Sequence, residues 1–338
     1  MSSDSLRVLF YHRIGDAAAE DPYLAPELIS ASAQEFDRQI RHLARAYQPI
    51  GANDLLAALD SAAPLPHRAV LVTFDDAYRD FLHIAWPIMK QHRVPAVLFV
   101  STAYVEDPAR LFWWDAVWQS LTRTRHTAAD FEQLPLLTPN QRRLAWRTLT
   151  ARFKRLTPAQ RRAAVDGLAE TLGVTLESPR AVLSWAELRQ LAADGLAVGG
   201  HSRTHELLDQ CPADVLDAEV AGCRDDLVRE LGNTVPLFAY PNGNFSDATS
   251  SALSSAGYRV GFTTLPGLNE HWTRQPLRVR RDGHSTSFLR FAVKLLYPVA
   301  KRRCDERHEA VAAPGAPSTP GGAGFAAGAA GRRRVASD

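Results

Sequence analysis

The stretch Ala69-Val70-Leu71-Val72-Thr73-Phe74-Asp75-Asp76 carries most of the information about the fold. It begins as a short apolar run with Pro66 just before it, and it ends in two acids. Such a run is typical of a strand that is buried on both faces of a parallel sheet. The sequence therefore predicts a parallel strand over residues 69–74 that delivers two carboxylates to its C-terminal edge.

Asp75 and Asp76 are adjacent, and two neighbouring carboxylates repel each other. Side chains on consecutive residues at the end of a strand point in different directions. One carboxylate can therefore bind a cation, which relieves the repulsion, while the other stays free to take a proton.

Two histidines supply further candidate ligands. The run Leu196-Ala197-Val198-Gly199-Gly200 indicates a second strand, and His201-Ser202-Arg203-Thr204-His205 follows it. In a helical turn, residues four apart lie on one face. Neutral imidazole and carboxylate suit zinc or a similar first-row ion, and two His with one Asp leave positions open for water and substrate. Such histidine pairs also occur in cores and caps, but the paired acids favour a catalytic metal site.

Three motifs carry a family resemblance. In order along the chain they are Thr73-Phe74-Asp75-Asp76, the stretch 201–205, and Phe238-Ala239-Tyr240-Pro241-Asn242-Gly243. They resemble successive motifs of the polysaccharide deacetylases of the NodB-homology type, or carbohydrate esterase family 4. Tyr11-His12-Arg13-Ile14 is similar to the opening of many members. The resemblance extends from about residue 6 to about residue 290, with a poorly matching middle.

The resemblance implies a fold, a cofactor and roles for the site residues. The fold would be a distorted (β/α) barrel of about seven strands, with the motifs at the C-terminal ends of the strands. Asp75 would be the general base, and Asp76, His201 and His205 would bind a divalent metal, which we expect to be Zn²⁺ with Co²⁺, Ni²⁺, Fe²⁺ or Mn²⁺ as alternatives. Tyr240 would offer its backbone N–H to the oxyanion.

Two positions depart from the family pattern. The late histidine of the family usually stands in a Leu-x-His context, whereas the candidate proton donor here, His284, follows Asp282-Gly283 and a predicted strand over residues 277–280. The alternative for His284 is a surface loop residue. Many members also carry an arginine before the third motif that orients the base; residues 236–239 lack one, and we predict that Arg280 or Arg281 substitutes for it.

Strands and helices alternate along the chain. Ser32 with Glu35 and Ser184 with Glu187 are predicted to cap helices. Parallel strands joined by helices form an open sheet or a barrel, and periodicity alone does not decide between them. Besides the strand over residues 69–74, strands are predicted over residues 6–11, 95–100, 196–199, 237–240 and 259–263.

Residues 105–180 lack a strand signal and predict a helical insertion. Thr138-Pro139 and Thr157-Pro158 are typical helix starts with proline at the first helical position. At its entry, Phe112-Trp113-Trp114-Asp115 and Trp118 either stack on a sugar ring or belong to the core, and the core is the more common fate of such clusters.

The two ends of the chain bear on its location. The N-terminus shows no secretory signal, so we expect a cytoplasmic protein. The apolar segment 288–297, followed by Lys301-Arg302-Arg303, either docks on the barrel or makes peripheral contact with the inner membrane. Pro, Gly and Ala dominate from Ala310 onward. The predicted domains are therefore a catalytic domain over residues 1–305 and a disordered tail over residues 306–338.

Composition agrees with an enzyme. The chain has 338 residues, of which 46% are hydrophobic, and it can bury a sizeable core. A formal net charge of +2 argues against nucleic acid as a partner, and the cysteines, three in number, form no CxxC pair.

The main interpretation is a metal-dependent deacetylase that hydrolyses N-acetyl, or N-formyl, groups of an amino sugar. Its substrate would be a cell-envelope polysaccharide or, given the cytoplasmic location, a lipid-linked precursor. No protein partner is predicted. A hydrolase of other linear or cyclic amides, such as an allantoinase-like enzyme, is the rival enzyme class. A catalytically inactive glycan-binding domain is the rival outside enzymes, although the presence of both acids and both histidines counts against it.

Overall fold

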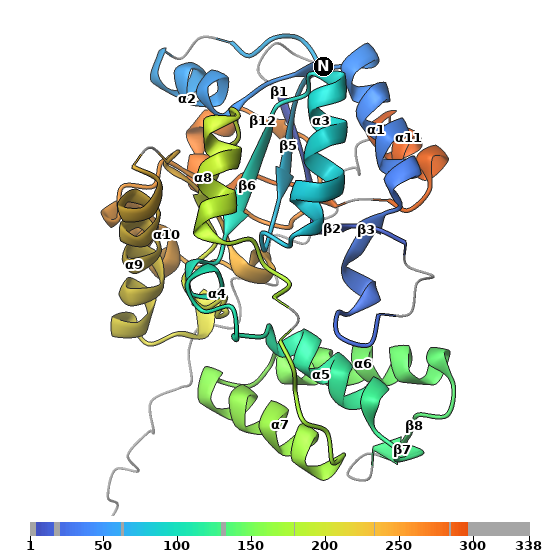
Figure 1. The fold of residues 1–338 in the computed structure, drawn as a ribbon. Coiled ribbons are helices and arrows are strands. Elements are labelled where there is room, and N and C mark those ends of the chain that lie inside the picture. Colours follow the sequence, from blue (N-terminus) through green and yellow to red (C-terminus); the bar gives the residue numbers. More distant parts are fainter. Residues whose placement is uncertain are drawn as a thin grey trace, which may run out of the picture. The chain divides into compact units, whose positions relative to one another are not determined.

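Six parallel strands form the centre of the computed structural model, which describes residues 5–16, 21–61, 64–129, 133–178, 180–232, 234–283 and 285–296 (Figure 1). In the order in which they pair, they are β1 (Ser5–Tyr11), β5 (Ala69–Phe74), β6 (Ala96–Val100), β9 (Ala197–Gly200), β10 (Leu237–Ala239) and β11 (Val260–Phe262). Each matches a predicted strand to within one residue at either end. His284, Lys301–Arg303 and the predicted tail lie outside the described residues.

The segment from Val279 to Gly283 touches both edges of this sheet. Val279 forms a parallel bridge with Phe262 of β11, and β13 (Asp282–Gly283) pairs in parallel with Leu9 and Phe10 of β1. The segment thus takes the place of a seventh strand and curls the sheet toward closure. The expected distorted (β/α) barrel of about seven strands is confirmed.

The prediction of a strand over residues 277–280 is wrong. Residues Pro276–Arg278 form a 3₁₀ turn (η6), and pairing starts only at Val279. Proline fixes φ and lacks an N–H, so it starts a helical turn readily but cannot donate to a sheet ladder.

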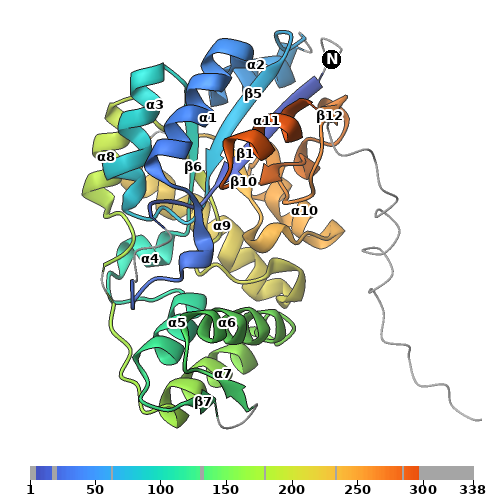
Figure 2. The same cartoon turned by 90° about the vertical axis from the view of Figure 1, so that its right-hand side faces the viewer.

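Helices cover the outside of the sheet (Figures 1 and 2). The Ser32 side chain accepts the Glu35 N–H at the start of α1, and Ser184 and Glu187 form the predicted reciprocal capping box before α8. The helices are α1 (Ala33–Ala46), α2 (Ala52–Ser61), α3 (Trp86–His92), α4 (Thr102–Glu106), α8 (Trp185–Ala193), α9 (Ala213–Leu231), α10 (Asp247–Ser255) and α11 (Phe288–Leu296).

Several short elements complete the described chain. They include strands β2 (Arg13–Ile14), β3 (Ile29–Ala31), β4 (Gln48–Pro49) and β12 (Asn269–Glu270). The 3₁₀ turns are η1 (Pro26–Leu28), η3 (Leu208–Gln210), η4 (Pro241–Gly243) and η5 (Trp272–Arg274), and a π-helical turn, η2 (Phe81–Ala85), leads into α3.

The helical insertion lies beyond the C-terminal ends of the strands (Figure 1). It consists of α5 (Trp113–Arg123), α6 (Pro139–Phe153) and α7 (Pro158–Thr171), which share an apolar core of their own. Both predicted helix starts are confirmed, with capping boxes at Thr138 and Thr157. The expectation that this region has no strand is wrong: β7 (Ala128–Ala129) and β8 (Leu134–Pro135) pair as a hairpin. Strands of two residues are too short to show periodicity.

The last described helix, α11, docks on the barrel. Phe291 and Leu295 are buried in the same core cluster as residues of α1. The buried guanidinium of Arg7 donates to the Leu295 carbonyl at 3.2 Å and pairs with Asp282 at 2.6 Å, which ties α11 to β1 and β13. For residues 288–296 the docking alternative is therefore confirmed. None of the described helices has the length and apolar character needed to cross a bilayer.

Candidate metal centre

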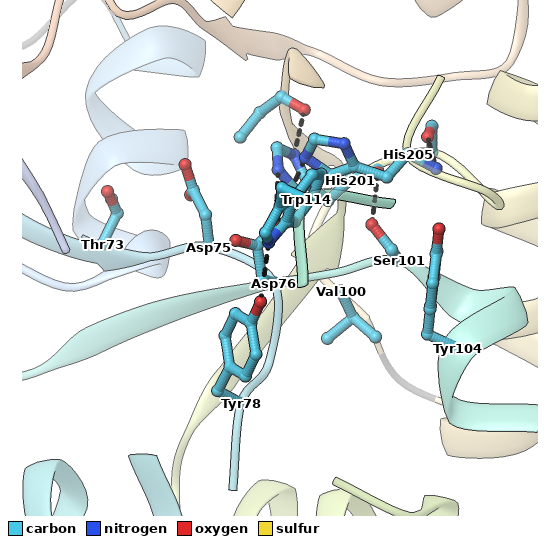
Figure 3. Close-up of polar contacts among 12 residues, drawn as sticks. Thr73, Asp75, Asp76, Tyr78, Val100, Ser101, Tyr104, Trp114, His201 and His205 are labelled. Atoms are coloured by element: carbon cyan, nitrogen blue, oxygen red, sulfur yellow. Dashed lines mark hydrogen bonds and ion pairs between the residues drawn. The ribbon is translucent and has the colours of Figure 1, made fainter. Parts of the chain in front are cut away.

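Asp76, His201 and His205 come together at the C-terminal ends of β5 and β9 (Figure 3). One ligand atom from each lies within 4.8 Å of the others. The Nε2 atoms of His201 and His205 are 3.5 and 3.3 Å from Oδ1 of Asp76. All three side chains are buried, and among the described residues no group donates a hydrogen bond to that Oδ1. A buried carboxylate oxygen without a donor is costly, and a cation would satisfy it.

The backbone fixes the orientation of His201. Its Nδ1 lies 2.7 Å from the carbonyl oxygen of Ala239, so Nδ1 carries the proton and donates it there. The lone pair of Nε2 then faces Asp76. Histidines that bind metals are oriented by such a second contact. The arrangement fits a divalent ion of the zinc type, held by two imidazoles and one carboxylate.

The loops that carry Asp76, His201 and His205 include backbone conformations that residues with side chains rarely adopt. Asp76, Ser202 and His205 all have positive φ, at 71°, 61° and 56°. Such residues persist only where the surroundings fix them. Here the Ser202 hydroxyl accepts the His205 N–H at 2.9 Å, and the Ser101 hydroxyl donates to the His201 carbonyl at 2.8 Å (Figure 3).

Two acids of α9 hold the same loop from outside. The backbone N–H of Thr204 donates to Glu219 at 2.8 Å. Nε of Arg203 donates to Asp226 at 3.0 Å, and Asp226 also accepts the Thr102 hydroxyl at 2.7 Å. The loop with both histidines is thereby fixed to α9 and to the start of α4.

Asp75 does not join the three-residue cluster and is bound by Arg281 instead. The two terminal nitrogens of the guanidinium donate to the two oxygens of Asp75 at 2.7 and 2.8 Å, and its Nε donates to the Thr263 carbonyl at 2.9 Å. Arg281 is fully buried, while Arg280 contacts the Pro266 carbonyl. Of the two arginines proposed from the sequence, Arg281 contacts the base candidate.

Burial and neighbouring charges set the pKa values at the site. Burial opposes the charge of Asp75, but the Arg281 guanidinium outweighs it and lowers its pKa. For Asp76, burial is likewise outweighed by its contacts with the imidazoles of His201 and His205, and its pKa falls to about 2. Burial lowers the pKa of His205 to about 3, which keeps its imidazole neutral. Both acids are thus ionised, and His205 is neutral as a ligand must be.

The structure contradicts the role predicted for Tyr240. Its backbone N–H donates to the carbonyl of Phe262 at 3.0 Å, in the ladder that joins β10 to β11. A donor committed to a sheet is not free for an oxyanion. Its hydroxyl, in turn, donates to the Leu277 carbonyl at 3.0 Å. Tyr240 therefore supports the strand end.

His12 was missed as a site residue. It follows β1, where the Asp75 N–H donates to the neighbouring Tyr11 carbonyl at 2.9 Å. The charge of His12 contributes to the lowered pKa of both Asp75 and Asp76, and its buried Nδ1 has no hydrogen-bond partner in the described part of the chain. The motif at residues 11–14 could have pointed to His12, but its resemblance to the family did not assign this histidine a role.

The aromatic residues of the insertion entry belong to the core. Phe112, Trp114 and Trp118 are each less than a tenth exposed. The ring of Trp114 lies edge-on to His205, 4.6 Å between centroids. Its Nε1 donates to the Tyr78 hydroxyl at 2.9 Å (Figure 3). Phe112 and Trp114 therefore pack against the ring of His205, and the alternative of an open sugar-stacking face is not supported for the three buried aromatics.

Fold and site together define a barrel with an acid pair and two histidines at the C-terminal ends of its strands. Comparison with known proteins identifies the family. The profile of the family described as polysaccharide deacetylase matches residues 62–261, and the chain belongs to this family. It is therefore related to hydrolases that act on N-acetyl groups.

Individual relatives are distant. The chain is 31% identical over 99 residues to the poly-β-1,6-N-acetyl-D-glucosamine N-deacetylase of Escherichia coli (strain K12). That match spans 29% of this chain and only 14% of the relative.

Two solved structures share the fold. The Streptococcus pyogenes deacetylase PplD in complex with acetate is 20% identical, with a TM-score of 0.56 over 82% of this chain and 92% of that one. IcaB from Ammonifex degensii is also 20% identical, with a TM-score of 0.56 over 87% and 98%.

Proposed function

We propose that this protein is a metal-dependent hydrolase that removes N-acetyl groups from an amino sugar in a cell-envelope polysaccharide or its lipid-linked precursor. The main support for this proposal is that the two adjacent acids, Asp75 and Asp76, have different partners. Asp76 shares a buried cluster with two histidines, while Asp75 is bound by an arginine and stands outside it. One carboxylate is thus available as a ligand and the other as a base.

Asp76, His201 and His205 would hold the metal, and their ligand types favour zinc. A divalent ion bound there would polarise the acetyl carbonyl and lower the pKa of water.

Asp75 would take the proton of the attacking water. Both of its oxygens accept one bond from Arg281, and each keeps a further lone pair. The guanidinium therefore fixes the direction of the carboxylate and keeps it ionised while leaving it able to accept a proton. A positioned base of this kind typically contributes about 10²–10⁴-fold to a rate.

The leaving amine needs a proton, and we propose His12 as its donor. It directly follows Tyr11, whose carbonyl accepts the Asp75 N–H at 2.9 Å, and its buried Nδ1 has no hydrogen-bond partner among the described residues. His284, the donor predicted from the sequence, lies outside the described residues and remains the competing assignment.

The name of the Escherichia coli relative suggests the first substrate to test. Protein loaded with Zn²⁺ or Co²⁺ should release acetate from β-1,6-linked N-acetylglucosamine oligomers, and removal of the metal by a chelator should stop the release. N-formyl sugars and allantoin serve as comparison substrates. Acetate release from none of the N-acetyl sugars, with turnover of a cyclic amide, would replace the proposal by the rival enzyme class. Sugar binding without any turnover would favour the inactive glycan-binding domain.

A further inference from the structure

Helices α1 and α11 run side by side on the outer side of the barrel (Figures 1 and 2). Residues of both helices line a basic hollow. Its volume is about 210 Å³, and it is lined by Arg38, Arg41, His42, Arg45 and Phe288. The rings of His42 and Phe288 are in edge-on contact, 5.6 Å between centroids, and join the two helices. None of these residues belongs to the site described above.

The arginines of α1 repeat at helical spacing and face solvent. Arg38 pairs with Glu35 at 2.9 Å, and Arg41 pairs with Asp37. Both arginine side chains remain almost half exposed, at 49% and 46%, so these pairs are weak. Within the described ranges, Arg45 has no carboxylate at ion-pair distance. The hollow thus keeps a positive charge that an anionic group would neutralise.

The outward side of α11 is apolar. Leu289 and Val293, one helical turn apart, are 72% and 46% exposed, and the exposed Arg290 stands between them. Phe291 and Leu295, on the opposite side, are buried against the barrel. Docking therefore uses only one side of this helix and leaves a second apolar side in solvent, on the same helix whose Phe288 lines the hollow with the arginines of α1.

We propose that this surface, the α1–α11 face (Arg38, Arg41 and Arg45 with Leu289, Arg290 and Val293), docks on an anionic lipid bilayer. Leucine and valine enter the boundary between head groups and acyl chains, and the arginines bind the lipid phosphates. A free phosphate ion explains the arginines but gives the apolar pair no role. The proposal does not depend on the chemistry of the metal centre.

Sedimentation of the full-length protein with lipid vesicles tests this. The protein should bind vesicles of phosphatidylglycerol and phosphatidylcholine, and vesicles of phosphatidylcholine alone should bind it much less. A basic residue near an anionic surface contributes about 1 kcal/mol, so the triple change Arg38→Gln, Arg41→Gln and Arg45→Gln should weaken binding roughly 100-fold at low salt. The pair Leu289→Ser and Val293→Ser should also weaken it.

The insertion supplies matched controls. Arg125→Gln, Arg155→Gln and Arg162→Gln remove the same charge, and Leu137→Ser with Leu144→Ser removes exposed apolar surface that is 68% and 59% accessible. Both sets should leave vesicle binding and acetate release nearly unchanged.

The proposal is overturned if the protein ignores anionic vesicles, or if the control changes weaken binding as much as those on the α1–α11 face. It is also overturned if binding is lost on changing Lys301, Arg302 and Arg303 to Gln but not on changing the face. Acetate release from a soluble oligomer, measured on the same variants, separates this outcome from a failure of the proposed function.

Discussion

At the scale of single residues, Arg281 shows how a side chain distant in the sequence can orient Asp75, the proposed base. Its guanidinium reaches Asp75 from the segment that closes the barrel, and both groups are buried. Sequence alone left Arg280 and Arg281 as equal candidates, because the choice depends on which side of that segment faces inward. The pairing of Val279 with β11 and of Asp282 with β1 sets that direction.

Replacing Arg281 should move the acid limb of the pH–rate profile. In Arg281→Met, burial still opposes the charge of Asp75 while the lowering effect of the guanidinium is gone, so the pKa of Asp75 rises. Since the base acts only when ionised, activity should then be lost at a higher pH than in the wild type. The measurement is kcat/KM against pH, with Arg281→Lys as a control that keeps the charge. An acid limb that stays in place in Arg281→Met would show that Arg281 does not tune Asp75.

His12 and His284 can be separated by the leaving group. If His12 protonates the departing amine, His12→Ala should lower turnover of an N-acetyl sugar by about 10²–10⁴-fold and spare an activated acetyl ester, whose leaving group needs little protonation. The amide-to-ester rate ratio is measured for His12→Ala and His284→Ala. A ratio that falls only in His284→Ala would return the role to His284.

At the scale of elements, the end of β9 depends on two glycines just before the first histidine. A Cβ on Gly199 would lie 2.6 Å from the Leu237 carbonyl oxygen, and one on Gly200 would lie 2.3 Å from the Tyr258 hydroxyl. The close approach of β9 to β10 therefore requires glycine. It also brings the Ala239 carbonyl to His201.

Gly199→Ala should lower the free energy of unfolding by about 1–3 kcal/mol, because the added methyl would overlap the backbone carbonyl of Leu237 in β10. The control is Gly167→Ala in α7, where a Cβ meets nothing within 4 Å. There the change should stabilise the helix by about 0.5–1 kcal/mol. Urea denaturation measures both. Equal effects at the two positions would contradict the close approach of β9 and β10.

Some of the secondary-structure elements could be predicted from the sequence and others could not. The strand over residues 69–74 was predictable because an apolar run between Pro66 and two acids leaves few alternatives. The 3₁₀ turn at Pro276–Arg278 was not, because its apolar and basic residues also suit a strand. The prediction for Tyr240 was wrong for another reason. Whether its backbone N–H is free depends on the pairing of β10 with β11, which the identity of the residue does not reveal.

At the scale of the whole molecule, the insertion is fastened to the barrel beside the metal centre. The buried Arg161 of α7 pairs with Glu206, the residue after His205. Asp115 of α5 accepts the Ala25 N–H at 2.8 Å and the Tyr78 hydroxyl at 2.7 Å. The insertion is therefore positioned to support the loops around Asp76 and His205, a role that no local sequence pattern indicated.

Asp115 should make stability depend on pH. Burial raises its pKa to about 7, so the folded state holds a proton that the unfolded chain releases at lower pH. Its contribution is fully present below the unfolded pKa and is lost as pH rises through about 7. Between pH 5 and pH 8 the free energy of unfolding of the wild type should fall by on the order of 2 kcal/mol more than that of Asp115→Asn. Urea denaturation at both pH values, with the exposed Asp166→Asn as control, measures this. The prediction is refuted if the free energy of unfolding changes equally with pH in the wild type and in Asp115→Asn.

In the proposed mechanism Asp75 is the base and Asp76 is a metal ligand, and one paired measurement tests this assignment. Metal content and acetate release are determined together for Asp75→Asn, Asp76→Asn and His201→Ala. Asp75→Asn should keep its metal and lose nearly all turnover, because the base is gone and the ligands remain; Asp76→Asn and His201→Ala should lose both. An Asp75→Asn protein without metal, beside an Asp76→Asn protein that retains it, would contradict the assignment.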